Sequence, residues 1–143
     1  MIIHFNVPGR PVPKERPRVT KYSTYTPKPT SDFQRRISAA YKALGCGPFP
    51  AGVPLSVTVA AHFQTPKSLS GKKRAALEGR PHIKRGDLDN VVKSVLDALN
   101  GSAFPDDSAV YHITATKDYR EEPGVDITIF TKAENCNEKN IMY

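Results

Sequence analysis

The alternation of apolar with small or polar residues from Val53 to Phe63 restricts the fold of this chain more than any other feature. The apolar positions recur at every second residue and are Val53, Leu55, Val57, Val59, Ala61 and Phe63. This spacing is typical of a strand with one buried face. We therefore expect a sheet, with this segment as its clearest strand.

Other segments predict further strands and two main helices. Weaker alternation predicts strands at 2–8, 109–118 and 125–131. Thr30-Ser31-Asp32 offers capping groups for a helix through about Leu44, ended by Gly45. Apolar residues from Leu88 to Leu99 follow helical spacing, and Asn100-Gly101 ends that helix. This order favours an α+β fold with a mixed, mainly antiparallel sheet.

The length of 143 residues fits one small domain. We expect the domain to span residues 1–132, with a polar C-terminal tail at 133–143. No apolar run approaches the roughly 20 residues of a membrane span, and no secretory leader is evident, which predicts a cytoplasmic protein. Cys46 and Cys136 stand far apart without further ligands at zinc-site spacing, so a structural zinc site is not expected.

Basic residues are concentrated in two segments of the chain, which has a net charge of +7. The segment from Arg10 to Lys42 contains nine Lys or Arg and two acids. The segment from Lys67 to Arg85 contains seven Lys or Arg and one acid. The first segment includes a proline-rich arm at 9–18, which is expected to run extended over the surface. This distribution suits a polyanion partner, although solvated polar faces would look the same.

Four acids flank the predicted helix at 88–99. Asp87 and Asp89 stand at its start, and Asp106 and Asp107 follow it in the link to the next strand. If the chain turns back after the helix, all four carboxylates could share one place, and hard oxygen ligands favour Mg²⁺ or Mn²⁺. The alternative is that these acids only cap the helix and form a turn.

Lys93 lies one helical turn after Asp89, and Asp97 lies one turn after Lys93. Lys93 is either a cation close to a reacting phosphate or a solvated residue paired with its neighbours. Asp97 is interpreted as a partner for Lys93 rather than as a metal ligand.

Two stretches of the sequence resemble a known family. The central stretch contains Lys84-Arg85-Gly86-Asp87-Leu88-Asp89-Asn90-Val91-Val92-Lys93, then Asp97-Ala98-Leu99 and Phe104-Pro105-Asp106-Asp107. It resembles the signature of the RusA family of Holliday junction resolvases. The opening, Gly9-x-Pro11-x-Pro13-Lys14-x-Arg16-Pro17-Arg18 with Tyr25-Thr26-Pro27, is similar to that of the longer, often phage-borne members.

The resemblance implies a RusA-like fold and a homodimer that makes paired cuts in four-way DNA junctions with Mg²⁺, for which Mn²⁺ can substitute. By position, it implies that Asp87, Asp89 and Asp107 are the essential acids, Lys93 the important lysine and Asp106 the adjacent acid. It also implies a role in recombination and repair, in a bacterial cell or a phage-infected host.

The resulting hypothesis is hydrolysis of DNA phosphodiesters by metal-activated water. Asp87, Asp89, Asp107 and Asp106 would hold the metal, and Lys93 would assist. Backbone phosphates would be gripped by Lys14, Arg16, Arg18, Lys72, Lys73, Arg74, Lys84 and Arg85. Two alternatives remain, which are a nuclease for flaps or other branched DNA and an inactive DNA-binding accessory protein.

Overall fold

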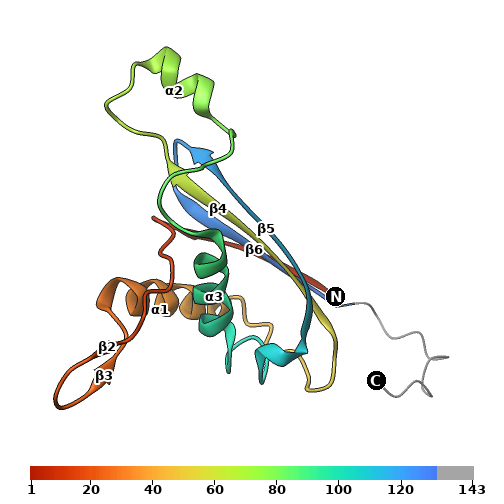
Figure 1. The fold of residues 1–143 in the computed structure, drawn as a ribbon. Helices are drawn as coiled ribbons and strands as arrows, with labels where there is room; N and C mark the ends of the chain where they lie inside the picture. The colour runs from red at the N-terminus through yellow and green to blue at the C-terminus, as the bar shows by residue number, and fades with distance from the viewer. Residues whose placement is uncertain (132–143) are drawn as a thin grey trace.

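Residues 1–131 are described by the computed structural model, and their centre is a four-stranded mixed sheet (Figure 1). The strands are β1 (Ile2–Pro8), β4 (Leu55–Gln64), β5 (Val110–Arg120) and β6 (Gly124–Phe130), in the order β1-β6-β4-β5. Two neighbouring pairs are antiparallel, and β4 and β5 are parallel. The expected mixed, mainly antiparallel sheet in a small single domain is confirmed.

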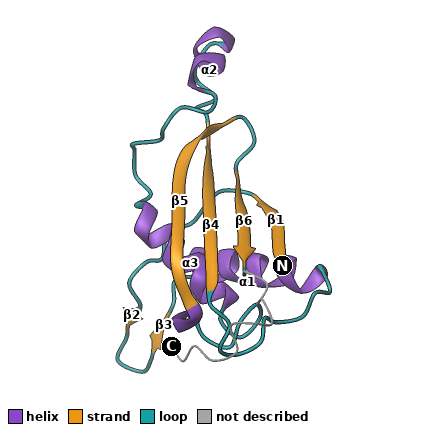
Figure 2. Cartoon of the chain, turned by 90° about the vertical axis from the view of Figure 1, so that its right-hand side faces the viewer, coloured by secondary structure: helices purple, strands orange, loops and turns teal. Residues whose placement is uncertain are grey.

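Both main helices lie on one face of this sheet (Figure 2). They are α1 (Lys28–Ala43) and α3 (Leu88–Leu99), which pack against each other. The short helix α2 (Gly71–Leu77) lies on an excursion beyond one end of the sheet. The excursion and α3 form the crossover between β4 and β5, which explains how these strands can be parallel.

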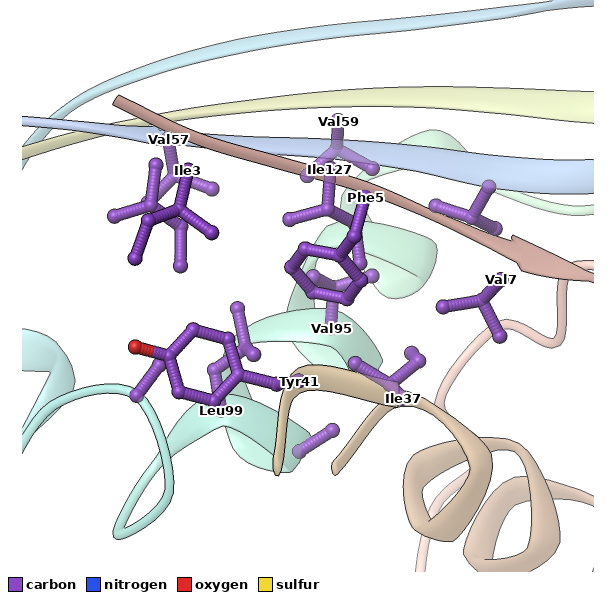
Figure 3. Packing of buried hydrophobic residues seen from close by; sticks show 14 of the residues in the cluster. Ile3, Phe5, Val7, Ile37, Tyr41, Val57, Val59, Val95, Leu99 and Ile127 are labelled. Carbon is purple, nitrogen blue, oxygen red and sulfur yellow. The ribbon is translucent and has the colours of Figure 1, made fainter. Parts of the chain in front are cut away.

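The core fills the layer between the sheet and the two helices (Figure 3). Alternate side chains of β1, β4 and β6 point into this layer, among them Phe5, Val57 and Ile127. The helices contribute residues at helical spacing, such as Ile37 and Leu99. Every second side chain of the strands and the apolar side chains on one face of each helix, which recur about every 3.6 residues, thus fill one apolar layer.

Two local predictions need correction. Helix α1 begins at Lys28 after Pro27, so Thr30-Ser31-Asp32 lies within the helix and supplies no side-chain cap. A proline at one of the first helical positions has a suitable φ and needs no donor, which explains the earlier start. The basic arm is followed by a small hairpin of β2 (Arg18–Val19) and β3 (Thr24–Tyr25), which the sequence did not predict.

The face of the sheet opposite the helices carries a polar network around His62. The two ring nitrogens of His62 lie 2.6 Å from a carboxylate oxygen of Asp118 and 2.7 Å from one of Asp126. Burial lowers the pKa of His62, but hydrogen bonds and charges from both carboxylates outweigh this effect and raise its pKa. The imidazole of His62 therefore links β4 to both neighbouring strands, and the two carboxylates favour its protonated form.

Among residues 1–131, no helix combines the length and apolar character needed to cross a membrane. The predicted polar tail at 133–143 lies outside the described residues.

Candidate functional site

Asp87 and Asp89 are exposed at the start of α3. Asp87 occupies the N-cap position, yet its side chain makes no capping hydrogen bond. No hydrogen bond or ion pair within residues 1–131 involves either carboxylate. The helix dipole favours acids at this end, but a capping role would require a bond that is absent here. Both carboxylates are therefore free to bind a ligand.

Lys117 of β5 holds the loop that leads into Asp87. Its ammonium group donates hydrogen bonds to the carbonyl oxygens of Lys84, at 2.9 Å, and Gly86, at 3.1 Å. Gly86 has a φ of +113°, and a Cβ atom there would lie 2.9 Å from the ring of Phe63. Only glycine fits this conformation and this close approach. The backbone just before Asp87 is thus fixed against the sheet.

A ring stack anchors the preceding part of the same loop. The buried imidazole of His82 stacks on Phe63 with ring centroids 4.2 Å apart, and it also contacts Tyr119. Burial, with the nearby positive charges of Lys117 and Lys84, lowers the pKa of His82. A neutral His82 is therefore part of the scaffold that carries Asp87 and Asp89.

The other two acids lie at the far end of α3. Asp107 begins the 3-10 turn η1 (Asp107–Ala109), which follows the loop after the helix and lies toward the opposite end from Asp87 (Figure 1). A helix of 12 residues is about 18 Å long. The Asp106 side chain caps η1 by accepting a hydrogen bond from the Ser108 N–H, and hydrogen bonds from Ser108 lower its pKa.

Within residues 1–131, no three His, Cys, Asp or Glu side chains gather closely enough to hold a metal ion. The expectation that the link after the helix would bring all four acids to one place is therefore wrong for a single chain. The physical reason is that β5 runs back from the distal end of α3, so η1 stays there. Asp87 and Asp89 have the ligand chemistry that Mg²⁺ prefers, but they form only a partial ligand set.

The proline-rich arm runs beside α3 and changes the expected charge pairs. The Lys14 N–H donates to the carbonyl oxygen of Asn90, and the Lys14 ammonium group forms an ion pair with Asp97. Asp97 is thus the partner of Lys14, and the expected pair with Lys93 is wrong. Lys93 is exposed one turn beyond Asp89.

The expected DNA-binding residues lie on three segments, which are the arm with β2, the loop before Asp87 and α2. Arg16 and Arg18 are exposed on the arm and β2, and Lys84 and Arg85 are exposed in the loop before Asp87. On α2, Lys72 and Lys73 are exposed. Arg74 instead forms a two-pronged ion pair with Glu121, at 2.5 and 3.0 Å. Its guanidinium group braces α2 against the turn after β5.

Sequence reasoning missed the residues that support the loop, namely Lys117, Phe63 and His82. Lys117 and Phe63 look like ordinary strand residues, and only their position opposite the loop shows what they do. Gly86 directly before Asp87 was the one available signal, since a glycine next to a functional acid can indicate a special backbone conformation.

Comparison with known proteins identifies the family of the chain. The chain is 35% identical over 136 residues to "Uncharacterized protein YqaN" of Bacillus subtilis strain 168, an alignment covering 89% of this chain and 94% of that protein. The family described as "Endodeoxyribonuclease RusA" matches residues 8–130, a span that contains every Asp, Glu, Lys and Arg discussed above. The chain belongs to the RusA family of endodeoxyribonucleases.

Proposed function

We propose that this protein is an Mg²⁺-dependent endonuclease that resolves four-way DNA junctions in recombination and repair, acting as a homodimer. The observation that carries the proposal is the pair of unpartnered carboxylates, Asp87 and Asp89, at an exposed helix start in a chain of this family. Mg²⁺ fits carboxylate oxygens, and Mn²⁺ has similar ligand preferences.

Different residues of the chain would serve catalysis and DNA binding. Asp87 and Asp89 would bind the metal, and Lys93 would stabilise negative charge that develops on the phosphate. Exposed Lys and Arg side chains on the arm, on α2 and in the loop before Asp87 would contact backbone phosphates. Such contacts give affinity without reading sequence.

A homodimer follows from the geometry of the substrate. One set of acids per chain supplies one cut, whereas symmetric resolution of a junction needs two cuts. A dimer with two-fold symmetry is the smallest assembly that provides both.

Two other functions share most of these residues. A nuclease for flaps would use the same acids, and an inactive accessory protein would use the same basic surface. The free carboxylates argue against the accessory protein, because acids beside a bound phosphate weaken binding by charge repulsion unless a cation lies between them.

The direct experiment incubates the purified protein with a synthetic four-way junction, a flap and a linear duplex, each in Mg²⁺, Mn²⁺, Ca²⁺ or EDTA. We expect paired cuts in the junction with Mg²⁺ or Mn²⁺ and none in EDTA. Preferential cutting of the flap would replace the resolvase proposal, and binding without cutting in any metal would favour the accessory protein. Full activity in EDTA would exclude the metal.

Asp89→Asn tests the acid assignment. The variant should keep or raise its affinity for junction DNA in EDTA, because a negative charge is removed, while cleavage in Mg²⁺ falls by several orders of magnitude. The matched control is Asp32→Asn on α1, which removes an acid paired with Arg35 and should leave cleavage unchanged. Near-normal cleavage by Asp89→Asn would refute the assignment.

A further inference from the structure

The β2–β3 hairpin, residues 18–25, projects beyond the helix layer on the side away from the sheet (Figure 1). Every residue from Glu15 to Thr26 is exposed, so no side chain of the hairpin belongs to the core. Three of its side chains are nevertheless apolar or aromatic, namely Val19 at 79%, Tyr22 at 89% and Tyr25 at 46% of full exposure. Because an apolar side chain stabilises a fold only when folding removes it from water, the fold gains little from these three residues.

The turn of this hairpin presents Tyr22 at its tip. The Thr20 N–H donates to Ser23 O at 2.7 Å, and the Thr20 hydroxyl donates to Ser23 O and accepts from the Ser23 N–H, both at 3.0 Å. The two central positions of a turn are usually taken by Gly, Pro, Asn, Asp or Ser, but here they are Lys21 and Tyr22. The hydrogen bonds of Thr20 and Ser23 therefore account for the turn, and they do not account for the aromatic residue.

The hairpin and its flanks are basic. From Arg16 to Ser31 the chain contains four Lys or Arg and no Asp or Glu. The Lys21 ammonium group lies 5.8 Å from the centre of the Tyr22 ring. In proteins that bind single-stranded nucleic acid, aromatic rings stack on bases while neighbouring cations contact the phosphates. The β2–β3 hairpin combines both kinds of side chain.

We propose that the β2–β3 hairpin binds an unpaired DNA base, with the Tyr22 ring stacked on the base and Lys21 and Arg18 on the phosphates beside it. In a continuous duplex the neighbouring bases cover both faces of each base. A tyrosine ring can therefore stack only where a base is unpaired or its stack is interrupted, as at a bulge, a flap or a branch point. The inference rests on the proposed function for its substrate, branched DNA, and adds a residue that distinguishes branched from linear DNA.

The position of the hairpin favours DNA over other polyanions. The arm that leads into the hairpin is fixed to the first turn of α3, because the Lys14 N–H donates to Asn90 O at 2.9 Å, one residue after Asp89. The exposed basic side chains of the arm thus connect the acids of α3 with Tyr22 along one segment of chain. An anionic lipid surface would match the charge and the ring, but it would not explain this connection to the acids.

The stacking is tested by binding in EDTA, where cleavage does not contribute. Fluorescence anisotropy compares a duplex that contains a short bulge with the same duplex without it. Tyr22→Ala should raise the dissociation constant for the bulged duplex by about 5- to 140-fold, the range expected for one stacked base, and should change binding of the linear duplex little. Tyr22→Phe keeps the ring and should bind as wild type does. Because Tyr22 is exposed, both variants should melt at the wild-type temperature.

Val19→Ala is the matched control, since it removes an exposed apolar side chain from the same hairpin but no ring. It should keep the preference for the bulge. No loss in Tyr22→Ala, or an equal loss in Val19→Ala, would overturn the proposal. Binding to vesicles of phosphatidylserine and phosphatidylcholine that depends on Tyr22, without an effect on bulged DNA, would also overturn it and assign the hairpin to a lipid surface.

The same measurements separate this inference from the proposed function. A wild type that prefers the bulge through Tyr22 but cuts no DNA in Mg²⁺ would refute only the proposed function. A wild type that cuts four-way junctions but binds the bulged and the linear duplex equally would refute only the role of the hairpin.

Discussion

Lys117→Met removes one ammonium group and tests whether the loop before Asp87 must be held in place. Methionine has an unbranched side chain of similar length, so the change removes the two hydrogen bonds to Lys84 O and Gly86 O together with the positive charge over the Phe63 ring. A hydrogen bond from a charged group contributes about 1.5–3 kcal/mol where it is buried. The bond to Lys84 O is exposed, so water replaces it and the expected loss of stability is about 1–3 kcal/mol.

The effect on cleavage should be larger than the effect on stability. A displacement of about 1 Å in a reacting group can cost about 100-fold in rate, and Asp87 follows Gly86 directly. We expect single-turnover cleavage of junction DNA to fall by about 10- to 100-fold, with affinity in EDTA unchanged. Lys117→Arg, which retains donors, should recover part of the rate, and the control Lys42→Met on α1 should behave as wild type.

A different outcome would give Lys117 another role. If its ammonium group contacts a phosphate, Lys117→Met would weaken binding in EDTA and lower the slope of log K against log salt by about 0.9. If cleavage, affinity and melting temperature all stayed unchanged, the two hydrogen bonds would have no part in positioning Asp87, and the reasoning would be refuted.

Three other substitutions probe separate parts of the molecule. Gly86→Ala should lower stability by about 1–3 kcal/mol and reduce cleavage, because a Cβ at a φ of +113° is strained and meets Phe63. A thermal melt equal to wild type would contradict this. Replacing both Arg16 and Arg18 with Ala should lower the salt slope of DNA binding by about 0.9 for each lost phosphate contact, measured by fluorescence anisotropy. An unchanged slope would mean that the arm does not touch the backbone. The raised pKa of His62 means that its stabilising effect is full below its unfolded pKa and is lost as pH rises through the folded value. The stability gap between wild type and His62→Gln in urea melts should therefore be larger at pH 6 than at pH 9, and a gap independent of pH would show that the imidazole is not charged.

The sequence predicts elements whose residues carry their own periodicity. The strand at Leu55–Gln64 and the helix at Leu88–Leu99 agree closely with the expected segments, since each has one buried face. The hairpin of β2 and β3 has no such signal, because its residues are exposed on both faces. The short pairing there depends on a turn closed by Thr20 and Ser23 rather than on a buried pattern.

The candidate site was predicted in its residue types but not in its assembly. The sequence predicts exposed acids at the start of α3, since Asp87 directly precedes an amphipathic segment and Asp89 lies in its first turn. The distance between Asp89 and Asp107 depends instead on the direction of the chain after Leu99. That direction is set by the parallel pairing of β5 with β4, a long-range contact that local periodicity does not encode.

The placement of Asp87 and Asp89 also allows the effect of a substitution on stability to be distinguished from its effect on cleavage. Acids in the first turn of a helix are favoured by its dipole by about 0.3–1 kcal/mol, which offsets their mutual repulsion in the absence of metal. Neither carboxylate makes a hydrogen bond within the described residues, so replacing one with an amide breaks no contact. The free energy of unfolding of Asp89→Asn should therefore lie within about 1 kcal/mol of the wild-type value. A loss of cleavage by several orders of magnitude in such a variant cannot arise from unfolding, and so it would report directly on the chemistry of the acid.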